Sequence, residues 1–201
     1  MISLSPGLSA AAIGLVLTIG TVAAHAQDIS APKALATCTQ CHGQTGDSPV
    51  ATTPRLNGQQ KPYLVERMGQ FMTAHQKVPQ GMSGMPDAFG NVSQQEKDAI
   101  ADYFARQAPT PAKPGPGSAQ GMRLFKEGTK DSRIIACVQC HGAAGEGHDA
   151  VPRIAGQHRD YLESQLAMFA SKMRGKPIMH PNTERMTRAE MASLASYLGS
   201  D

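Results

Sequence analysis

The pattern Cys-x-x-Cys-His occurs twice in this chain, as CTQCHG at 38–43 and CVQCHG at 137–142, and it uses all 4 cysteines of the 201 residues. In an exported protein such a cysteine pair forms a disulfide, half of a zinc site, or the thioether links of a haem. The adjoining histidine favours haem, because on one helical turn both sulfurs reach one side of a porphyrin and the next imidazole meets the iron. A histidine beside its cysteine is badly placed for tetrahedral zinc. We therefore expect two c-type haems, attached through Cys38, Cys41, Cys137 and Cys140 and ligated by His42 and His141.

The cysteine motifs belong to a longer internal repeat. TPRLNGQQKPYL (53–64) follows the first motif and VPRIAGQHRDYL (151–162) follows the second, so both halves contain Pro-Arg-aliphatic-x-Gly-Gln and then Tyr-Leu. Each half closes with a similar segment, SQQEKDAIADYF at 93–104 and TRAEMASLASYL at 187–198. Self-similarity of this kind indicates a duplicated structural unit. Each unit is short and the chain has 0 tryptophans, so each interior needs support from a metal, a disulfide or a bound cofactor.

The periodicity of the repeat is helical. Ser93 with Glu96, and Thr187 with Glu190, have the spacing of capping boxes, which begin helices. Apolar residues from Tyr161 onward recur at helical spacing and predict a buried stripe that extends to Met173. No segment alternates as a strand does. The predicted fold class is all-α, with two tandem domains, each a small helical bundle around one haem.

Residues 1–26 are interpreted as a signal peptide that precedes the domains. Leu8 to Ala24 is apolar and uncharged, and Ala24-His25-Ala26 has the small-x-small pattern of a cleavage site. The apolar run is shorter than the ~20 residues of a spanning helix, which favours cleavage over an uncleaved anchor. Export to a bacterial periplasm is therefore expected.

A segment rich in proline and glycine, APTPAKPGPGS at 108–118, divides the rest of the chain. Such a composition suits neither helix nor strand and predicts a stiff, extended linker. The expected organisation is therefore a first domain at 27–108, a linker at 109–118 and a second domain at 119–201.

The sixth ligand of each iron is expected to be methionine. Met85 precedes Tyr103 by 18 residues, and Met179 precedes Tyr197 by 18 residues, so the two methionines are in register across the repeat. Met82 is the local rival of Met85. His180 is the rival of Met179, and its partner position in the first half is a proline.

Together these residues resemble the dihaem class I cytochromes c of the cytochrome c4 type. The resemblance rests on the two CxxCH motifs, the two Pro-Arg-aliphatic-x-Gly-Gln…Tyr-Leu segments, the distal methionines and the closing Ala-x-x-Ala-x-Tyr helix. It implies tandem class I cytochrome c domains that shuttle single electrons in the periplasm, commonly towards a terminal oxidase. It also implies that the carbonyls of Pro54 and Pro152 accept hydrogen bonds from His42 and His141, which fixes the imidazole tautomers.

Three functions are compatible with such a chain. The favoured one is a soluble electron carrier with closed His-Met irons, whose partners are a donor dehydrogenase or cytochrome complex and an acceptor oxidase or reductase, with transient docking on membrane complexes. The alternatives are a cytochrome subunit of a dehydrogenase complex and a catalytic dihaem enzyme, such as a peroxidase or a thiosulfate-oxidising cytochrome, which needs an open or differently ligated iron. The net charge of +3 is too small to indicate a nucleic-acid partner.

Overall fold

The computed structural model describes Met1 and the residues numbered 33–73, 85 and 92–200. Apart from Met1, the predicted signal peptide lies outside the described residues, as does Met82, the rival of Met85. Within the described part no helix has both the length and the apolar character needed to cross a bilayer.

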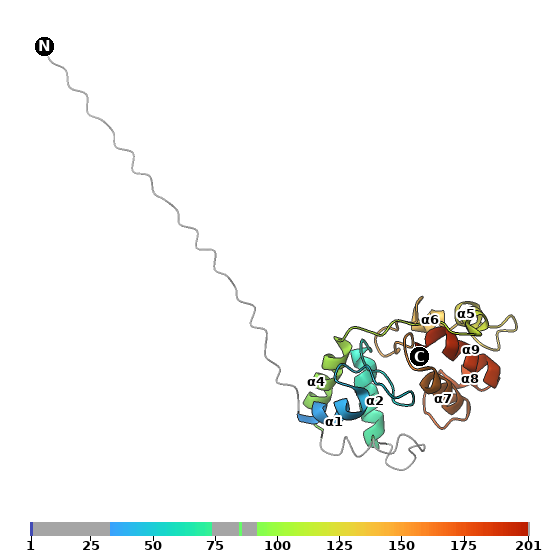
Figure 1. Ribbon diagram of the computed structural model, residues 1–201, viewed down its shortest axis with the longest axis horizontal. Coiled ribbons are helices and arrows are strands. Elements are labelled where there is room, and N and C mark those ends of the chain that lie inside the picture. The colour runs from blue at the N-terminus through green and yellow to red at the C-terminus, as the bar shows by residue number, and fades with distance from the viewer. Residues whose placement is uncertain (2–32, 74–84, 86–91, 201) are drawn as a thin grey trace.

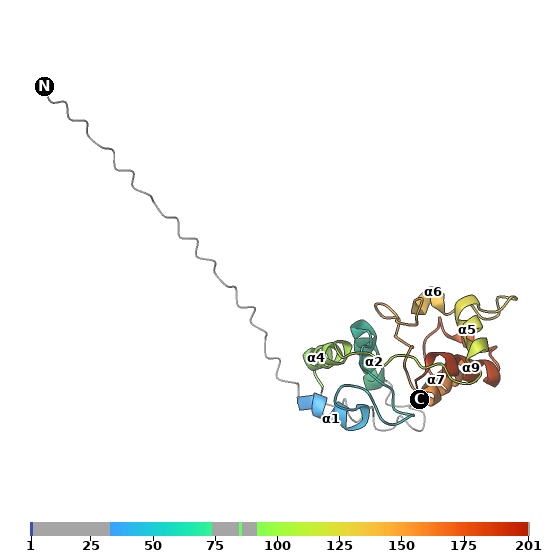
Figure 2. The same cartoon turned by 45° about the horizontal axis from the view of Figure 1, so that its top comes forward.

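The helices form two groups that stay separate in both views of the ribbon (Figures 1 and 2). The first lobe consists of α1 (Lys33–His42), α2 (Lys61–Thr73) and α4 (Gln94–Ala105). The second lobe consists of α5 (Ser118–Glu127), α6 (Val138–His141), α7 (Arg159–Ala170), α8 (His180–Thr183) and α9 (Arg188–Leu198). Bridges outside helices are isolated among the described residues, at His148–Val151 and Gln157–Gly199. The prediction of a helical chain is confirmed for this part of the protein.

Both predicted capping boxes are confirmed. Ser93 caps α4 and Thr187 caps α9, and in each case the side chain accepts a hydrogen bond from the backbone N–H of the glutamate three residues later. That glutamate in turn accepts from the backbone N–H of the cap residue. Two N–H groups that have no partner inside the helix are thereby satisfied.

Each lobe has its own apolar core, built on the repeat-equivalent helices. In the first lobe α2 packs on α4, and in the second lobe α7 and α5 pack on α9. The first core contains Leu35, Leu64, Met68, Phe71, Ile100, Ala101 and Phe104. The second core contains Leu124, Phe125, Ile134, Leu162, Leu194, Ala195 and Leu198.

The expectation that Met173 belongs to the core is wrong. Its side chain is 59% exposed, because α7 ends at Ala170 and the backbone turns at Lys172, which has a φ of 61°. The apolar spacing continues past the end of the helix, but the chain no longer follows the helical path that would bury the side chain. By contrast, Met68 of α2 and Met191 of α9 lie inside helices and are buried.

The segment 108–118 has no helix until Ser118, as predicted, but it is fastened to both lobes. The side-chain amide of Asn57 donates to the carbonyl of Ala108 at 2.8 Å. Further along, the backbone N–H of Lys113 donates to the carbonyl of Gly199 at 2.7 Å. The segment is therefore part of the contact between the lobes rather than a free spacer.

The lobes also meet through the repeated Arg-x-x-x-Gln sequence. Gln59 of the first lobe accepts from the backbone N–H of Arg153 at 2.7 Å and donates to its carbonyl at 2.9 Å. Gln157 of the second lobe does the same with the backbone of Arg55, at 2.8 and 3.0 Å. Equivalent residues of the two repeats thus exchange equivalent bonds, which is the pattern of a two-fold symmetric interface.

Candidate functional site

The first CxxCH motif forms the last turn of α1. Cys38 is half-buried and packs against the first core, Cys41 is exposed, and His42 is buried with 4% of its surface accessible. The chain turns sharply at the next residue, because Gly43 has a φ of +78° and a Cβ there would lie 2.8 Å from the carbonyl oxygen of Asp47. Glycine after the histidine therefore has a structural reason.

The ring of His42 is held by one nitrogen and leaves the other without a partner. Its Nδ1 lies 2.8 Å from the carbonyl oxygen of Pro54, and since a carbonyl only accepts, Nδ1 carries the proton and donates. Nε2 is buried and forms no hydrogen bond. Burial lowers the pKa of His42 despite the opposing effect of the Pro54 bond, so the ring is neutral at neutral pH. A buried, unpartnered nitrogen lone pair is what a metal ligand presents.

The second CxxCH motif repeats this arrangement on α6. Cys137 lies just before the helix and is half-buried, whereas Cys140 is exposed. His141 is buried, and its Nδ1 lies 3.0 Å from the carbonyl oxygen of Pro152. Burial again lowers the pKa of the histidine. Both hydrogen bonds that the family resemblance implies are therefore present in the structure.

All four cysteines are unpaired thiols in this structure. Burial raises the pKa of Cys38, and it raises the pKa of Cys137 to about 11, so both thiols are protonated at neutral pH. Dithiol oxidoreductases depend on a CxxC thiol whose pKa is lowered instead. The first cysteine of each pair therefore lacks the lowered pKa of a redox-active thiol. One half-buried and one exposed sulfur beside the histidine fit the two links of a covalent haem.

The candidate sixth ligands lie in different surroundings. Met85 is half-buried and packs against the same apolar core as Cys38. Met179 directly precedes α8, and its carbonyl accepts from the hydroxyl of Thr183 at 2.8 Å. The rival His180 has its Nδ1 2.8 Å from the carbonyl oxygen of Phe169, which ties the ring to the end of α7.

A further histidine, outside the CxxCH motifs, lies between the lobes. His158 is 3% exposed, and its Nε2 lies 2.9 Å from the carbonyl oxygen of Ser48 in the first lobe. It is therefore a satisfied histidine of the interface. The interface roles of His158, Gln59 and Gln157 were missed in the sequence, although the repetition of a polar Gly-Gln step before each Tyr-Leu helix was a signal for the last two.

Comparison with known proteins gives matches over both lobes. The family described as "Cytochrome C oxidase, cbb3-type, subunit III" matches residues 31–104, and the family described as "Cytochrome c" matches residues 118–200. A relative named cytochrome c4 from Azotobacter vinelandii is 32% identical, over 95% of this chain and 98% of its own. A relative named thiosulfate dehydrogenase electron acceptor, from Thiomonas intermedia, is 33% identical, over 91% of this chain and 88% of its own.

A solved structure of similar shape is the cytochrome c4 of Acidithiobacillus ferrooxidans. It has a TM-score of 0.75 and 32% sequence identity, and the match covers 81% of this chain and 98% of that one. The similarity therefore includes both lobes and not one repeat alone.

Proposed function

This chain belongs to the cytochrome c4 family of dihaem electron-transfer proteins, and we propose that it is a periplasmic carrier which shuttles single electrons between a donor dehydrogenase or cytochrome complex and a terminal acceptor such as an oxidase. Membership confirms the all-α fold of two tandem class I cytochrome c domains and the two c-type haems that the sequence predicts.

The residues proposed to hold the haems follow the repeat. Cys38 and Cys41 attach the first haem and His42 and Met85 ligate its iron; the second haem is held in the same way by Cys137, Cys140, His141 and Met179. A bound haem supplies an iron that alternates between the ferrous and ferric states and so carries one electron at a time. Methionine as the sixth ligand fills the position that a substrate would need and raises the potential.

The observation that carries this proposal is the state of His42. Its Nδ1 is fixed by Pro54 while its buried Nε2 has no partner, directly after two cysteines of the required spacing. A buried polar atom without a partner is costly, so a native protein rarely contains one without a ligand for it. For the second haem the support is the matching contact of His141, whose Nδ1 is fixed by the carbonyl oxygen of Pro152.

Domain organisation is proposed as follows: a signal peptide at 1–26, a first domain at 27–108, a linker at 109–118 and a second domain at 119–201. Mass spectrometry of the secreted protein tests this organisation together with the haem links. We expect a chain that begins near Gln27 and is heavier by two haems. A mass that fits two disulfides instead would contradict the assignment of the cysteines.

Binding of carbon monoxide distinguishes a carrier from a dihaem enzyme. We expect the reduced wild-type protein to bind carbon monoxide poorly at both irons, because their sixth positions are filled. Met179→Ala should open the second iron alone, while His180→Ala should leave its visible spectrum unchanged. Stoichiometric binding to the wild-type protein, or peroxide turnover at enzymatic rates, would support the catalytic alternative.

A second candidate function is that of the electron-accepting partner or subunit of a sulfur-compound dehydrogenase. It is favoured by the similarity to the Thiomonas intermedia protein named thiosulfate dehydrogenase electron acceptor. Mixing the ferric holoprotein with a thiosulfate dehydrogenase and thiosulfate should then reduce the haems much faster than thiosulfate alone. Equal rates with and without the dehydrogenase would remove this candidate.

A further inference from the structure

The segment that carries Met179 is anchored to the end of α7. The imidazole of His180, the next residue, donates from Nδ1 to the carbonyl oxygen of Phe169 at 2.8 Å. A carbonyl only accepts, so this bond fixes both the tautomer and the orientation of the ring. Since α7 also packs on α8, the backbone directly after Met179 is tied to a longer helix of the second lobe.

A second anchor joins the same segment to the chain in front of the second CxxCH motif. Nδ2 of Asn182 donates to the carbonyl oxygen of Ile178 at 3.2 Å, and Oδ1 accepts from the backbone N–H of Ile135 at 3.3 Å. Ile178 directly precedes Met179. Ile135 lies two residues before Cys137, where the motif begins. One amide side chain therefore connects the two stretches of chain that are proposed to ligate and to attach the second haem.

The hydroxyl of Thr183 adds a third, local contact to this segment. Thr183 is 1% exposed and donates to the carbonyl oxygen of Met179 at 2.8 Å. The backbone N–H of Met179 in turn donates to the carbonyl oxygen of Lys176 at 2.9 Å. Both backbone polar groups of Met179 are thus bonded, while His180 and Asn182 connect the same short stretch to two separate parts of the lobe.

The first half of the repeat has different residue types at these positions. Met85 and Met179 both lie 18 residues before the tyrosine of the last helix, so the register after them has no gap. In that register His180, Asn182 and Thr183 correspond to Pro86, Ala88 and Phe89. The side chains of proline, alanine and phenylalanine contain no atom that donates or accepts a hydrogen bond. The equivalent residues of the first half therefore cannot form any of the three side-chain contacts.

We propose that His180 and Asn182 are positioning residues that keep Met179 on the second iron, and that the first iron gives up its methionine more readily. The proposal rests on the function proposed above and adds a division of roles to it. The second iron then acts as a relay that stays closed, whereas the first iron is the one that an added ligand reaches first.

The physical reason is the free energy of local opening. A thioether that raises the potential binds ferrous iron better than ferric iron, so the methionine bond is weakest in the ferric protein. The free energy of a local opening rises with the number of contacts that the opening breaks. Withdrawal of Met179 disturbs the bonds to the backbone of Phe169 and Ile135, and the residue types after Met85 provide no equivalent of these bonds.

Binding of imidazole to the ferric holoprotein tests the proposal. Imidazole binds only where the methionine has left the iron, so its apparent affinity is proportional to the fraction of open sites. The wild-type protein should lose its sulfur-to-iron charge-transfer band in two phases of similar amplitude, and the stronger phase should belong to the first iron. Met85→Ala should leave only the weaker phase in this band. If Met85→Ala left the stronger phase instead, the order of the two irons would be reversed and the proposal overturned.

Variants of the two positioning residues give the second readout. His180→Ala and Asn182→Ala should each strengthen the weaker phase on the order of threefold to tenfold, as expected for the loss of one or two hydrogen bonds, and leave the stronger phase unchanged. In the double variant the two phases should approach one another. Ser171→Ala is the matched control, because its exposed hydroxyl bonds only to the nearby carbonyl of Met168. The control should keep both wild-type affinities.

The remaining outcomes separate this proposal from the proposed function. If Asn182→Ala does not retain two haems, Asn182→Ser carries the test, because the serine side chain is too short to bond both partners. A single phase in the wild-type protein, or variants that change neither phase or shift both equally, would overturn the positioning role and leave the carrier function standing. Absence of c-type bands in the wild-type protein would overturn the carrier function itself.

Discussion

Met85 is the residue on which the proposed first haem site depends most directly after His42. We expect Met85→Ala to abolish the sulfur-to-iron charge-transfer band of one haem and to lower its potential by on the order of 0.1 V, within the ~0.8 V that axial ligands cover. The reason is the loss of a thioether ligand that stabilises ferrous iron. Visible spectroscopy and a redox titration measure both effects. Met82→Ala is the control, and the reverse outcome would show that the register with Tyr103 does not identify the ligand.

At this scale the sequence was most informative where chemistry requires fixed spacing. Cysteine and histidine in CxxCH are adjacent, so one helical turn determines their geometry, and the structure places His42 and His141 as buried rings bonded to Pro54 and Pro152. Burial was harder to predict where it depends on the path of the chain. Met173 continues an apolar spacing but lies beyond the end of α7, and His158 is buried by the opposite lobe.

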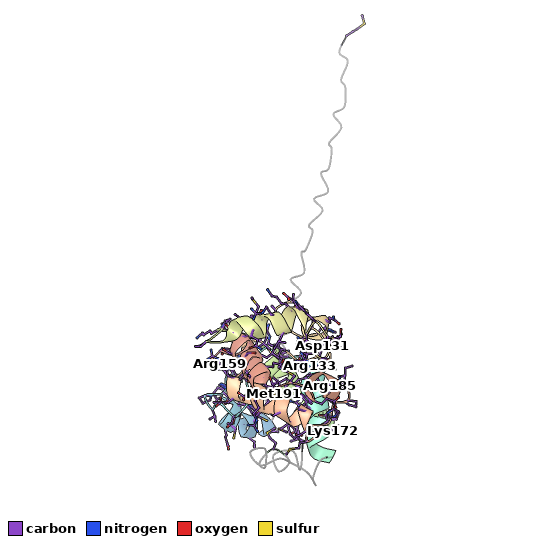
Figure 3. All side chains as sticks on the ribbon, turned by 90° about the vertical axis from the view of Figure 1, so that its right-hand side faces the viewer. Asp131, Arg133, Arg159, Lys172, Arg185 and Met191 are labelled. Carbon is purple, nitrogen blue, oxygen red and sulfur yellow. The ribbon has the colours of Figure 1, made fainter. Side chains whose placement is uncertain are left out.

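At the scale of elements, the starts of the last helices were predictable because a capping box involves residues only three apart. The long-range support of α9 was not. Arg133, 57 residues before Glu190, donates to its carboxylate at 2.7 Å and also to the carbonyl of Arg185. Figure 3 shows Asp131, Arg133 and Arg185 on the same flank of the molecule. Within the described part of the chain, the repeat-equivalent glutamate of α4, Glu96, forms its hydrogen bonds with Ser93 and none with an arginine. The sequence gives no sign of this difference.

The arginine contact predicts a difference in acid stability between the two boxes. The hydrogen bond from Arg133, together with those from Thr187, lowers the pKa of Glu190 from 4.5 to about 2. A carboxylate whose folded-state pKa is lowered stabilises the protein above its unfolded pKa, and this stability is lost as pH falls through the folded value. We expect Glu190→Gln to cost about 1–3 kcal/mol at pH 7, and the cost to shrink by roughly half near pH 3.

Thermal unfolding of the holoprotein at several pH values measures this effect. The matched control is Glu96→Gln, which removes the equivalent glutamate from an exposed capping box on α4. The control should lower the melting temperature less than Glu190→Gln does. Equal effects for the two variants at all pH values would show that Arg133 adds no stability to α9.

At the scale of the whole molecule, the duplication predicted two similar lobes but not how they pair. The two-fold arrangement depends on contacts between residues about one hundred positions apart, and no local pattern specifies them. Only the structure shows that Gln59 and Gln157 each bind the backbone of the opposite repeat. The net charge of the whole molecule bears on how it docks. Two haems add four propionates to the protein charge of +3, so the holoprotein is nearly neutral. Strong electrostatic steering towards a partner is therefore not expected.

The last prediction concerns the rigidity of the pair of lobes. Changing both Gln59 and Gln157 to alanine removes the four hydrogen bonds that cross the interface to the backbone of Arg55 and Arg153. It also removes one local bond in each lobe, from the backbone N–H of the residue that follows each glutamine. At about 0.5–1.5 kcal/mol for each of these four bonds across the interface, the interface should lose roughly 2–6 kcal/mol. Segment 108–118 is fastened to both lobes, so it should become easier to cleave by a protease once the lobes separate.

Limited proteolysis and small-angle scattering of the holoprotein measure this loosening. We expect faster cleavage within 108–118 and a larger radius of gyration for the double variant, with both haems retained because each site lies within one lobe. Gln120→Ala, which removes an exposed glutamine of α5, is the matched control. The two single variants complete a double-mutant cycle, and since the two glutamines act on one interface their effects should not be additive. Unchanged cleavage and scattering in the double variant would show that other contacts, such as those of Asn57 and His158, hold the lobes together by themselves.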